Sequence, residues 1–549
     1  MSAKDEAGER RGLLPRYTLK DHNTFLLADA LGDIHDSGDG FFSNDTRMLS
    51  QLELAIADRK PSVLGAAISQ DNTLFTAHLT NRPLAALGER AIPKGVIHIE
   101  RSRYLWDSRV YERLRLTNFS EEDAQLPLQL SFGADFADIF EIQGHERKQR
   151  GRLLPAEVQE QEVILAYEGL DQVRRCTHLQ LSGQPQTVSA ERSVWCVSLR
   201  RAEAIELFIE IGTEPGPAPS AERFEAGLGR LAARRRRELD AGATVSSSGH
   251  LFNEWLDRSR ADLALLTTQL PTGPYPYAGI PWFATQFGRD AIIASLQSLW
   301  IQPSLAAGVL RFQAATQAQE ASAFRDSEPG KIVHEMRRGE MAALDEVPFR
   351  CYYGSVDTTP LFVLLAGEYE RCTGDRELIA EIWPALLRAI GWIEHRLKRS
   401  PTGFLDYARG ADSGLSNQAW KDSQDSIFYA DGRFPTGPVA VVEVQGYAVA
   451  AFEAMAQLAA LREDAEASSA WRAQAHALAA AIERHFWLPE LEFYAIALDG
   501  DGRPCAVPAS NAGHLLYCGV PSEARAQKVA EQLCSESFDS GWGIRTLPQ

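Results

Sequence analysis

The fold and the chemistry of this chain are indicated by two stretches, Gly279-Ile-Pro-Trp-Phe-Ala-Thr-Gln-Phe-Gly-Arg-Asp290 and Asn417-Gln-Ala-Trp-Lys-Asp-Ser-Gln-Asp-Ser426. Each stretch places carboxylates beside a tryptophan and a cation, in a loop between segments with a helical pattern. This combination suits a pyranose, because aromatic rings pack against its C–H face and charged groups hydrogen-bond its hydroxyls. The two stretches therefore predict a sugar site built on a helical domain.

The residues before these stretches predict a separate β domain. Segments 96–106 and 110–118 alternate apolar with polar residues, which is the period of a half-buried strand. Further short strands are expected at 126–132, 163–167, 194–199 and 205–211. Many antiparallel strands without intervening helices indicate a β-sandwich over 17–215. We expect residues 1–16 to form a flexible N-terminus, and residues 216–249 to form a linker and a connecting helix.

From about residue 250 the hydrophobic period becomes that of a helix. Nine helices are expected, at about 252–266, 289–301, 305–319, 357–373, 376–398, 441–461, 466–487, 507–517 and 521–535, the fifth of them interrupted near Pro384. Short and long connections alternate between them. This pattern predicts a toroid of paired helices over 250–549, with its long loops at one end.

The composition excludes several classes of partner. The chain has 549 residues, 45% of them hydrophobic and 24% charged, which is typical of a globular protein with more than one domain. Its 56 basic and 74 acidic residues give a formal charge of −18, which disfavours nucleic acid and anionic membranes. The basic run at 234–237 lies among glutamates in a helix-like stretch, and we interpret it as a solvated helix face.

The cysteines and the N-terminus indicate where the protein acts. Seven cysteines are scattered without a Cys-x-x-Cys pair, which favours reduced thiols and a cytoplasmic location. The charged N-terminus and the absence of an 18-residue apolar run predict neither secretion nor a membrane span. His334 with Glu335 or Glu340 has no third ligand at suitable spacing, so we expect no metal, and no motif indicates another cofactor.

The first candidate binding residues are Arg289 and Asp290, which open a predicted helix. Asp290 could simply favour the helix dipole, with Arg289 as its ion-pair partner. Alternatively, the two residues bind the hydroxyls at one end of a sugar, while Trp282 or Phe283 provides the apolar platform.

Two further candidates precede the next helix. Asp357 could be an N-cap, since aspartate is among the best capping residues, or it could line a cleft. Tyr353 lies four residues before it, in an aromatic segment that could line the same cleft.

In the second stretch, Asp422 and Asp425 lie three residues apart beside Trp420 and Lys421. They could form a helix-surface ion pair. Aromatic and glycine-flanked surroundings instead indicate a cleft, where a carboxylic acid can be desolvated enough to keep its proton near neutral pH.

Glu443 and Gln445 are polar residues inside an apolar helix start. Buried polar groups need partners. A bound sugar could supply these partners, and so could a neighbouring loop.

On these residues, the chain resembles bacterial glycogen-debranching (amylo-α-1,6-glucosidase-like) proteins. Residues 17–215, which include the motif at 39–53, resemble their N-terminal domain. Residues 250–549 resemble their catalytic (α/α)6 barrel, which is related to glucoamylases, trehalases and mannosylglycerate hydrolases. The longest and most specific motifs lie at 279–290, 352–360, 417–426 and 540–547.

The resemblance implies an inverting, exo-acting α-glucosidase of carbohydrate metabolism, whose substrate is an oligosaccharide or a small glucoside. It implies that Asp422 is the general acid, that Arg289 and Asp290 hold the terminal sugar, and that Trp420 and Trp282 stack on sugar rings. Asp357, Lys421, Glu443 and Gln445 are weaker candidates from the resemblance, as residues that line the cleft. Further candidates for substrate binding, from the residues themselves, are Phe283, Tyr353 and Asp425. The oligomeric state cannot be read from the sequence.

The chain also departs from this family. An (α/α)6 barrel has twelve helices, whereas nine are expected here, and relatives carry the general base on a glutamate beyond the 540–547 motif. We therefore expect the toroid to lack its last helices, apolar helix faces to be exposed, and the base to have no counterpart among the 549 residues. The alternative function is a non-catalytic carbohydrate-binding protein or an inactive fragment.

Overall fold

The computed structural model describes residues 15–35, 38–84 and 92–549. It contains two compact units. Unit 1 consists of Met1–Thr268, Tyr277–Thr285 and Arg337–Glu346, and unit 2 consists of Gln269–Pro276, Gln286–Met336 and Val347–Gln549. This division differs from a single boundary near residue 250. Nearly all of the N-terminus that we expected to be flexible lies outside the described residues.

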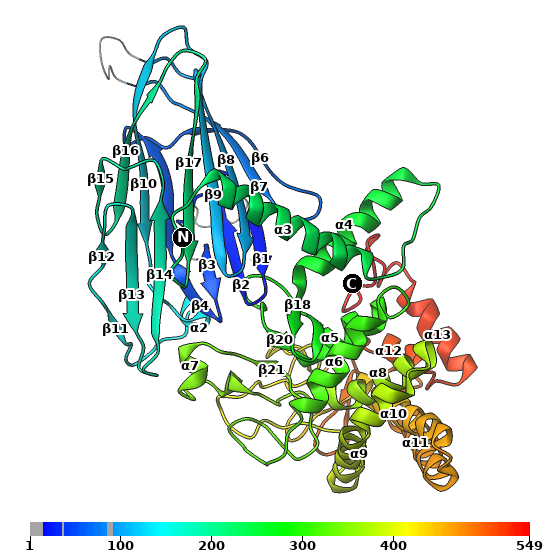
Figure 1. Cartoon of the computed structure of the whole chain (residues 1–549). Helices are drawn as coiled ribbons and strands as arrows, with labels where there is room; N and C mark the ends of the chain where they lie inside the picture. Colours follow the sequence, from blue (N-terminus) through cyan, green and yellow to red (C-terminus); the bar gives the residue numbers. More distant parts are fainter. Residues whose placement is uncertain (1–14, 36–37, 85–91) are drawn as a thin grey trace. The chain divides into compact units, whose positions relative to one another are not determined.

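Unit 1 is built mainly from antiparallel strands (Figure 1). They are β1 (Tyr17–Asp21), β2 (Thr24–Ala28), β3 (Gly40–Ser43), β4 (Thr46–Leu49), β5 (Gln51–Ile56), β6 (Ser62–Ile68), β7 (Phe75–Thr80), β8 (Ile97–Trp106), β9 (Arg109–Asn118), β10 (Ala124–Gly133), β11 (Arg152–Leu153), β12 (Glu157–Val158), β13 (Glu162–Glu168), β14 (Arg174–Leu181), β15 (Thr187–Val188), β16 (Arg192–Leu199) and β17 (Ala204–Gly212). Each of the six strands that the sequence predicts lies in one of these elements, so the prediction of an antiparallel β domain is confirmed.

Two sheets enclose the main core of unit 1. One has the order β15-β16-β10-β5, and the other has the order β11-β13-β14-β17-β9-β8-β7-β6, with β12 beside β13. Strand β10 buries Leu126, Leu128 and Leu130 at alternate positions, and these side chains share one cluster with Ile99 and Leu116 of the larger sheet. Alternation of this kind turns one face of each strand inward, which is why the two sheets pack as a sandwich. A third sheet, with the order β1-β2-β3-β4, completes the unit.

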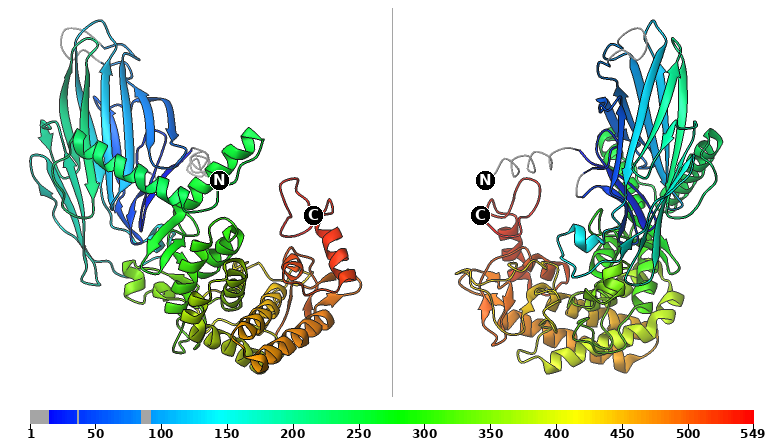
Figure 2. Two further views of the ribbon diagram at one scale, coloured as in Figure 1. Left: turned by 45° about the vertical axis from the view of Figure 1, so that its right-hand side comes forward. Right: turned by 90° about the vertical axis from the view of Figure 1, so that its left-hand side faces the viewer.

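Helix α3 (Ala221–Asp240) covers the other face of the larger sheet, and it is the green helix that crosses the strands in Figure 2. It packs Phe224 against Tyr104, whose hydroxyl donates to the Phe224 carbonyl at 2.8 Å. Gly227 allows this approach, because a Cβ there would lie 2.2 Å from the Tyr104 hydroxyl oxygen.

The interpretation of residues 234–237 as a solvated face is wrong for its first half. Arg234 pairs with Asp21 at 2.5 Å and lies over the Trp106 ring, and Arg235 is buried beside Glu238. The sheet beneath α3 provides partners that a helical pattern alone does not reveal.

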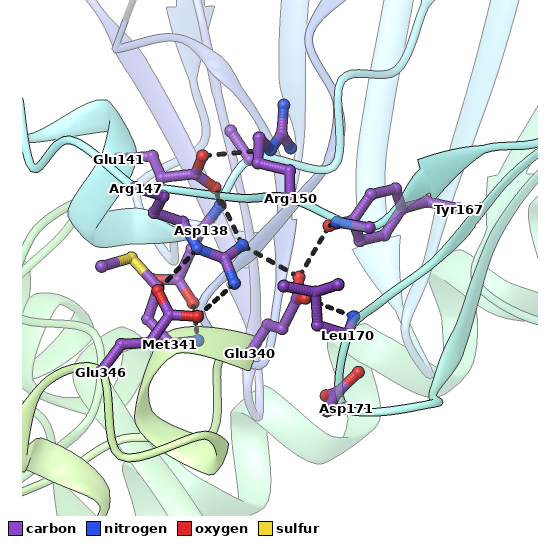
Figure 3. A network of polar contacts seen from close by, with 12 residues as sticks. Asp138, Glu141, Arg147, Arg150, Tyr167, Leu170, Asp171, Glu340, Met341 and Glu346 are labelled. Carbon is purple, nitrogen blue, oxygen red and sulfur yellow. Dashed lines mark hydrogen bonds and ion pairs between the residues drawn. The ribbon is translucent and has the colours of Figure 1, made fainter.

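A segment distant in sequence, Arg337–Glu346, also belongs to unit 1, and Figure 3 shows how it is held. The buried Glu340 carboxylate accepts from the Tyr167 hydroxyl at 2.9 Å, from the Leu170 N–H at 2.6 Å and from Arg147 at 3.2 Å. Arg147 also pairs with Glu346 at 2.6 Å. Together these bonds fix α7 (Glu340–Ala343) within unit 1.

Unit 1 contains two further helices. These are the short α2 (Ile139–Ile142), which begins at a capping box formed by Asp138 and Glu141, and the longer α4 (His250–Leu266).

Unit 2 is mainly helical (Figures 1 and 2). Its helices are α5 (Gly288–Ser298), α6 (Pro303–Ala315), η1 (Pro348–Arg350), α8 (Thr358–Thr373), α9 (Arg376–Arg399), α10 (Val442–Leu461), α11 (Ala465–His485), α12 (Ala512–Tyr517) and α13 (Glu523–Leu533). Short strands lie in the connections of the chain, namely β18 (Thr267–Leu270), β19 (Gly273–Pro276), β20 (Gln286–Phe287), β21 (Glu335–Met336), β22 (Ala440–Val441), β23 (Trp487–Leu488), β24 (Phe493–Tyr494), β25 (Ala497–Leu498) and β26 (Pro504–Cys505).

The longer helices of unit 2 form pairs of a buried and a half-buried helix. Helices α8 and α10 are buried along most of their length and pack against each other, where a Cβ on Gly367 would lie 2.6 Å from that of Ala454. Helices α9 and α11 pack against them and bury only one stripe each, as expected for an outer layer. The predicted interruption of α9 near Pro384 is wrong, because the helix is continuous and this proline lies on its exposed side.

Candidate active site

Four polar residues lie at the N-terminal ends of four helices in unit 2. Arg289 is the second residue of α5, Asp357 immediately precedes α8, Glu443 is the second residue of α10, and Asn511 immediately precedes α12. The long connections of unit 2 lead into these helix ends. Backbone N–H groups at helix N-termini are without intrahelical partners, so the end of the domain at which these residues lie suits oxygen-rich ligands.

Arg289 links the two predicted loops through its guanidinium. Its Nη1 lies 3.3 Å from Asp357 Oδ2, and its Nη2 lies 3.2 Å from Asp422 Oδ2. Asp357 is fully buried, whereas the Asp422 side chain is 45% exposed. Burial alone would lower the pKa of Arg289, but the carboxylates of Asp357, Asp290 and Asp422 outweigh it and raise this pKa. A fixed cation therefore joins a buried carboxylate to an accessible one.

Asp357 does not act as a side-chain cap. It occupies the N-cap position of α8, but its carboxylate makes no capping hydrogen bond and instead accepts from Arg289 and from the Ser355 hydroxyl. The capping alternative for Asp357 is therefore wrong, and its carboxylate serves to hold Arg289.

Glu443 is the fully desolvated carboxyl of this region. Neither of its oxygens has a hydrogen-bond partner in the part of the chain that the structure describes. Burial raises its pKa to about 7, Asp357 adds to the rise, and Asn511 and Lys421 partly offset it. The Asn511 amide acts on the pKa of Glu443, and both of its polar atoms also lack a hydrogen-bond partner among the described residues.

Gln445 lies two residues further along α10 and, unlike Glu443, has hydrogen-bond partners for its side chain among the described residues. Its Nε2 donates to the carbonyls of Leu405 and Val441 at 2.8 and 2.9 Å, and its Oε1 accepts from the Leu405 N–H at 2.9 Å. A neighbouring loop thus satisfies Gln445, which leaves it a structural role.

The loop 417–426 is closed by its first residue, Asn417. The Asn417 amide accepts from Tyr407 at 2.9 Å and donates to the Ser426 hydroxyl at 3.0 Å and to the Ser423 carbonyl. Closure holds Trp420 and Asp422, which lie between these contacts in sequence, in a fixed turn.

Trp420 and Lys421 lie against each other and against α12. The Lys421 ammonium lies 5.1 Å from the centroid of the Trp420 ring and donates to the Thr546 carbonyl at 3.3 Å. Burial lowers the pKa of Lys421, while Glu443 opposes the fall. The Trp420 ring also packs on His514, and its Nε1 is buried without a hydrogen-bond partner in the described residues.

The other predicted site residues are distributed as follows. Asp290 lies in the first turn of α5, where burial raises its pKa and Arg289 partly offsets the rise. Tyr353 is buried, and its hydroxyl donates to the Thr316 carbonyl at 2.7 Å, so this group is already occupied. Asp425 lies at an exposed position of the 417–426 loop.

Trp282 and Phe283 belong to unit 1. The Trp282 carbonyl accepts from Arg337 at 2.7 Å, and the Phe283 side chain is 52% exposed. Their predicted role as a sugar platform remains a prediction.

Sequence reasoning missed three polar side chains near this cluster. His514 accepts or donates at 2.7 Å to the Tyr447 hydroxyl, and its pKa is lowered by burial and by Lys421. The sequence position of Asn511 could have indicated it as a site residue, because it is a polar residue immediately before an apolar helix.

The third side chain that was missed as a site residue, His334, is buried, and its Nδ1 has no hydrogen-bond partner in the described chain. Burial, Arg289 and Lys331 all hold its pKa well below the ordinary value, so it is a neutral imidazole.

Three further observations concern metal ligands, cysteines and membrane-spanning helices. Among the described residues, no group of three or more histidine, cysteine, aspartate or glutamate side chains is arranged to hold a metal ion. Each of the seven cysteines is a free thiol. None of the helices in the described ranges is both long and apolar enough to cross a membrane.

Comparison with known families gives two matches. Residues 19–210 match the N-terminal domain of (some) glycogen debranching enzymes. Residues 286–549 match the mannosylglycerate hydrolase MGH1-like glycoside hydrolase domain. A search of curated proteins found no significant match.

Solved structures resemble the chain at low sequence identity. A bacterial glucoamylase complexed with acarbose is 11% identical with a TM-score of 0.53, over 95% of this chain and 80% of that one. A kojibiose phosphorylase from the human microbiome is 10% identical with a TM-score of 0.48, over 87% and 69%. A rhamnosidase from a Bacillus species is 16% identical with a TM-score of 0.42, over 79% of this chain and 38% of that one.

The fold and these matches define the chain as a glycoside hydrolase by resemblance, with a β domain followed by a helical domain consistent with a glucoamylase-like fold. More particularly, it joins an N-terminal domain of the glycogen-debranching type to an MGH1-like glycoside hydrolase domain.

Proposed function

We propose that this protein is an inverting, exo-acting glycoside hydrolase that releases a sugar from the end of an α-linked glucoside, as an amylo-α-1,6-glucosidase does. The observation that carries the proposal is a group of buried polar atoms on Glu443, Asn511 and Trp420, near the Arg289 cluster, for which the described residues provide no hydrogen-bond partner. Buried polar groups are normally satisfied, so such a group favours a ligand with several hydroxyls. The match to a glycoside hydrolase domain supports the same class.

In this proposal Asp422 is the general acid. An inverting enzyme needs one carboxylic acid to protonate the leaving oxygen and one carboxylate to activate water, about 6.5–9.5 Å away. Asp422 is accessible and is oriented by Arg289, which itself is fixed by the buried Asp357. We assign no residue to the general base.

Glu443 is proposed to bind substrate. With a pKa of about 7 it is about half protonated at neutral pH and mostly protonated below it, so a carboxyl O–H donor is present there. A protonated carboxyl can both donate to and accept from a sugar hydroxyl, and the Asn511 amide can do the same.

A substrate panel tests the proposed activity. The purified protein, expressed with any coding sequence that continues beyond residue 549, is incubated with isomaltose, maltose, a debranching-type limit dextrin, glucosylglycerate and mannosylglycerate, and released sugar is measured. Mannosylglycerate is included because residues 286–549 match a mannosylglycerate hydrolase MGH1-like domain. We expect release from at least one α-linked substrate, with inversion seen by NMR of the fresh product. Folded protein that releases sugar from none of them would contradict the proposal.

A second function, carbohydrate binding without hydrolysis, is favoured by one observation. The Asp422 carboxylate accepts from Arg289, an arrangement that also suits a purely binding role. Calorimetric titration with maltose distinguishes the two functions, because binding without turnover would support this second one.

The proposed setting is carbohydrate metabolism in the cytoplasm. It is supported by the seven free thiols, since a reducing compartment keeps cysteines unpaired.

A further inference from the structure

Unit 2 contains a cavity of about 300 Å³ that is separate from the candidate active site. Its walls come from the connection after α6, from the last turns of α9, from the connection after α9, and from Val356 and Gln418. Arg289, Asp422 and Glu443 are not among its lining residues. Its volume is at the lower end of the range for small-molecule pockets, so it suits a ligand of about one sugar ring.

One wall of the cavity carries the buried ammonium group of Lys331, which can donate further hydrogen bonds. Lys331 donates to the Asp326 carbonyl at 2.8 Å and lies 5.8 Å from the centroid of the Trp392 ring. Burial lowers its pKa to about 8, against the opposing effect of Glu328 and Asp326. An ammonium has three N–H donors, and this one makes a single hydrogen bond to the described residues.

The other charged side chains that line the cavity largely form ion pairs with one another. Arg396 pairs with Asp406 at 2.9 Å and with Glu328 at 3.3 Å, and Trp392 Nε1 donates to Glu328 at 2.7 Å. Carboxylates outnumber cations in the lining, so an anion such as a phosphate ester is disfavoured. The carboxylate oxygens retain lone pairs that can accept hydroxyl donors.

The lining therefore brings together the ammonium donor of Lys331, the carboxylate acceptors of Asp326, Glu328 and Asp406, and the indole of Trp392. This arrangement matches vicinal hydroxyls, each of which both donates and accepts, on a molecule with an apolar C–H face. We propose that this cavity is a second carbohydrate site, which binds one neutral polyhydroxylated molecule the size of a monosaccharide. The inference does not depend on the proposed hydrolysis, because its residues are distinct from those of the active site.

The cavity shares a wall with the candidate active site. The Val356 N–H donates to the Gln418 carbonyl at 2.8 Å, and Gln418 Nε2 donates to Asp326 at 3.1 Å. Val356 immediately precedes Asp357, and Gln418 is two residues before Trp420. A bound ligand would therefore stabilise the backbone that positions both loops of the active site, which makes the cavity suited to sensing a sugar.

The proposal is tested with the full chain containing 5-fluorotryptophan, observed by fluorine NMR while D-glucose is added. The Trp392 signal is assigned with Trp392→Phe. We expect this signal to shift in a saturable way, and to do so equally in Asp422→Asn. D-Glucose 6-phosphate, which has the same ring with a doubly charged group, should shift it far less.

Two variants block the cavity at exposed lining positions, Ala323→Leu and Ala408→Leu, and Ala470→Leu on the exposed side of α11 is the control. We expect the glucose-dependent shift of Trp392 to be lost in the first two and kept in the third, while hydrolysis persists in all three. A Trp392 signal that glucose does not shift would overturn the proposal. So would a glucose-dependent shift that is as large in the two blocking variants as in the unmodified chain. If the protein did not hydrolyse any glucoside, the glucose-dependent shift of the Trp392 signal would still be expected. The two proposals can therefore fail separately.

Discussion

Glu443 and Gln445 lie two residues apart at the start of α10 and are both fully buried, yet only Gln445 has hydrogen-bond partners in the described chain. The loop at Leu405 provides these partners, and none of the loops that the structure describes does so for Glu443. A buried polar residue with partners stabilises a fold, whereas one without them costs free energy and is retained for another reason. This difference separates the structural residue from the candidate binding residue.

The stability of the protein should fall as pH rises from about 4.5 to 7 because of Glu443. Its pKa is about 7 in the folded chain against an ordinary value of 4.5 for glutamate, so the folded state holds the proton more tightly across this window. Stability therefore decreases until both states are ionised, by roughly 3 kcal/mol at most. Glu443→Gln should remove this dependence and be the more stable protein at pH 8.

Urea unfolding at pH 5 and pH 8 measures this effect. Glu453→Gln, which changes a half-exposed carboxyl on the same helix, is the matched control and should leave the pH dependence in place. An unchanged pH dependence in Glu443→Gln would show that another group is responsible.

Gln445→Leu should destabilise the fold although it keeps the size of the side chain. It would leave the Leu405 N–H and C=O buried without their partner, at a cost of about 1–3 kcal/mol. The measurement is the free energy of unfolding from urea curves at pH 5, where Glu443→Gln is expected to be nearly neutral. A smaller loss for Gln445→Leu than for Glu443→Gln at this pH would reverse the assignment of their roles.

Arg289→Gln should destabilise unit 2 through Asp357. This carboxylate is fully buried and would lose its cation, and removing one partner of a buried pair costs about 3–5 kcal/mol. The double variant Arg289→Gln/Asp357→Asn should recover part of the loss, because no buried charge then remains unpaired. Thermal melts of both single variants and the double variant measure this coupling, and strictly additive losses would contradict it.

In unit 1, Glu340→Gln should cost more stability than Glu346→Gln. Both carboxylates contact Arg147, but Glu340 also accepts from the Tyr167 hydroxyl and the Leu170 N–H (Figure 3). Glu340 is 4% exposed, whereas Glu346 is 30% exposed. Weakening hydrogen bonds to a buried charged group costs about 1.5–3 kcal/mol, whereas a half-exposed pair contributes about 1 kcal/mol or less. Limited proteolysis near Arg337–Glu346 gives an independent readout, and equal sensitivity of the two variants would be the contrary result.

The strands and helices could be predicted from local pattern, because alternation and helical period reflect which face of an element is buried. Strands β8 and β10 and helices α8 and α10 lie where the patterns indicated. The attachment of Arg337–Glu346 to unit 1 could not be predicted, since its partners Tyr167 and Leu170 are about 170 residues away.

The candidate site was predictable only in part for the same reason. Sequence reasoning could place Glu443 and Gln445 at a helix start, but it could not tell which of them a distant loop satisfies. Tyr353 stays a predicted cleft residue, and the sequence could not show that its hydroxyl donates to the Thr316 carbonyl. Asn511 and His514 follow a long irregular segment, so nothing local connects them with Glu443 or Trp420.

Asp422→Asn keeps the shape of the side chain and can still contact Arg289, but it cannot donate a proton to a leaving oxygen. If Asp422 is the general acid, hydrolysis of an unactivated α-glucoside should slow by about 10²–10⁴-fold, while an aryl glucoside with a good leaving group is partly spared. Stability should change by no more than about 0.5 kcal/mol, because the side chain is 45% exposed. Asp425→Asn, three residues along the same loop at an exposed position, is the matched control and should keep nearly full activity. Near-normal turnover of the unactivated substrate by Asp422→Asn, with loss of activity in Asp425→Asn, would transfer the role of the acid to Asp425.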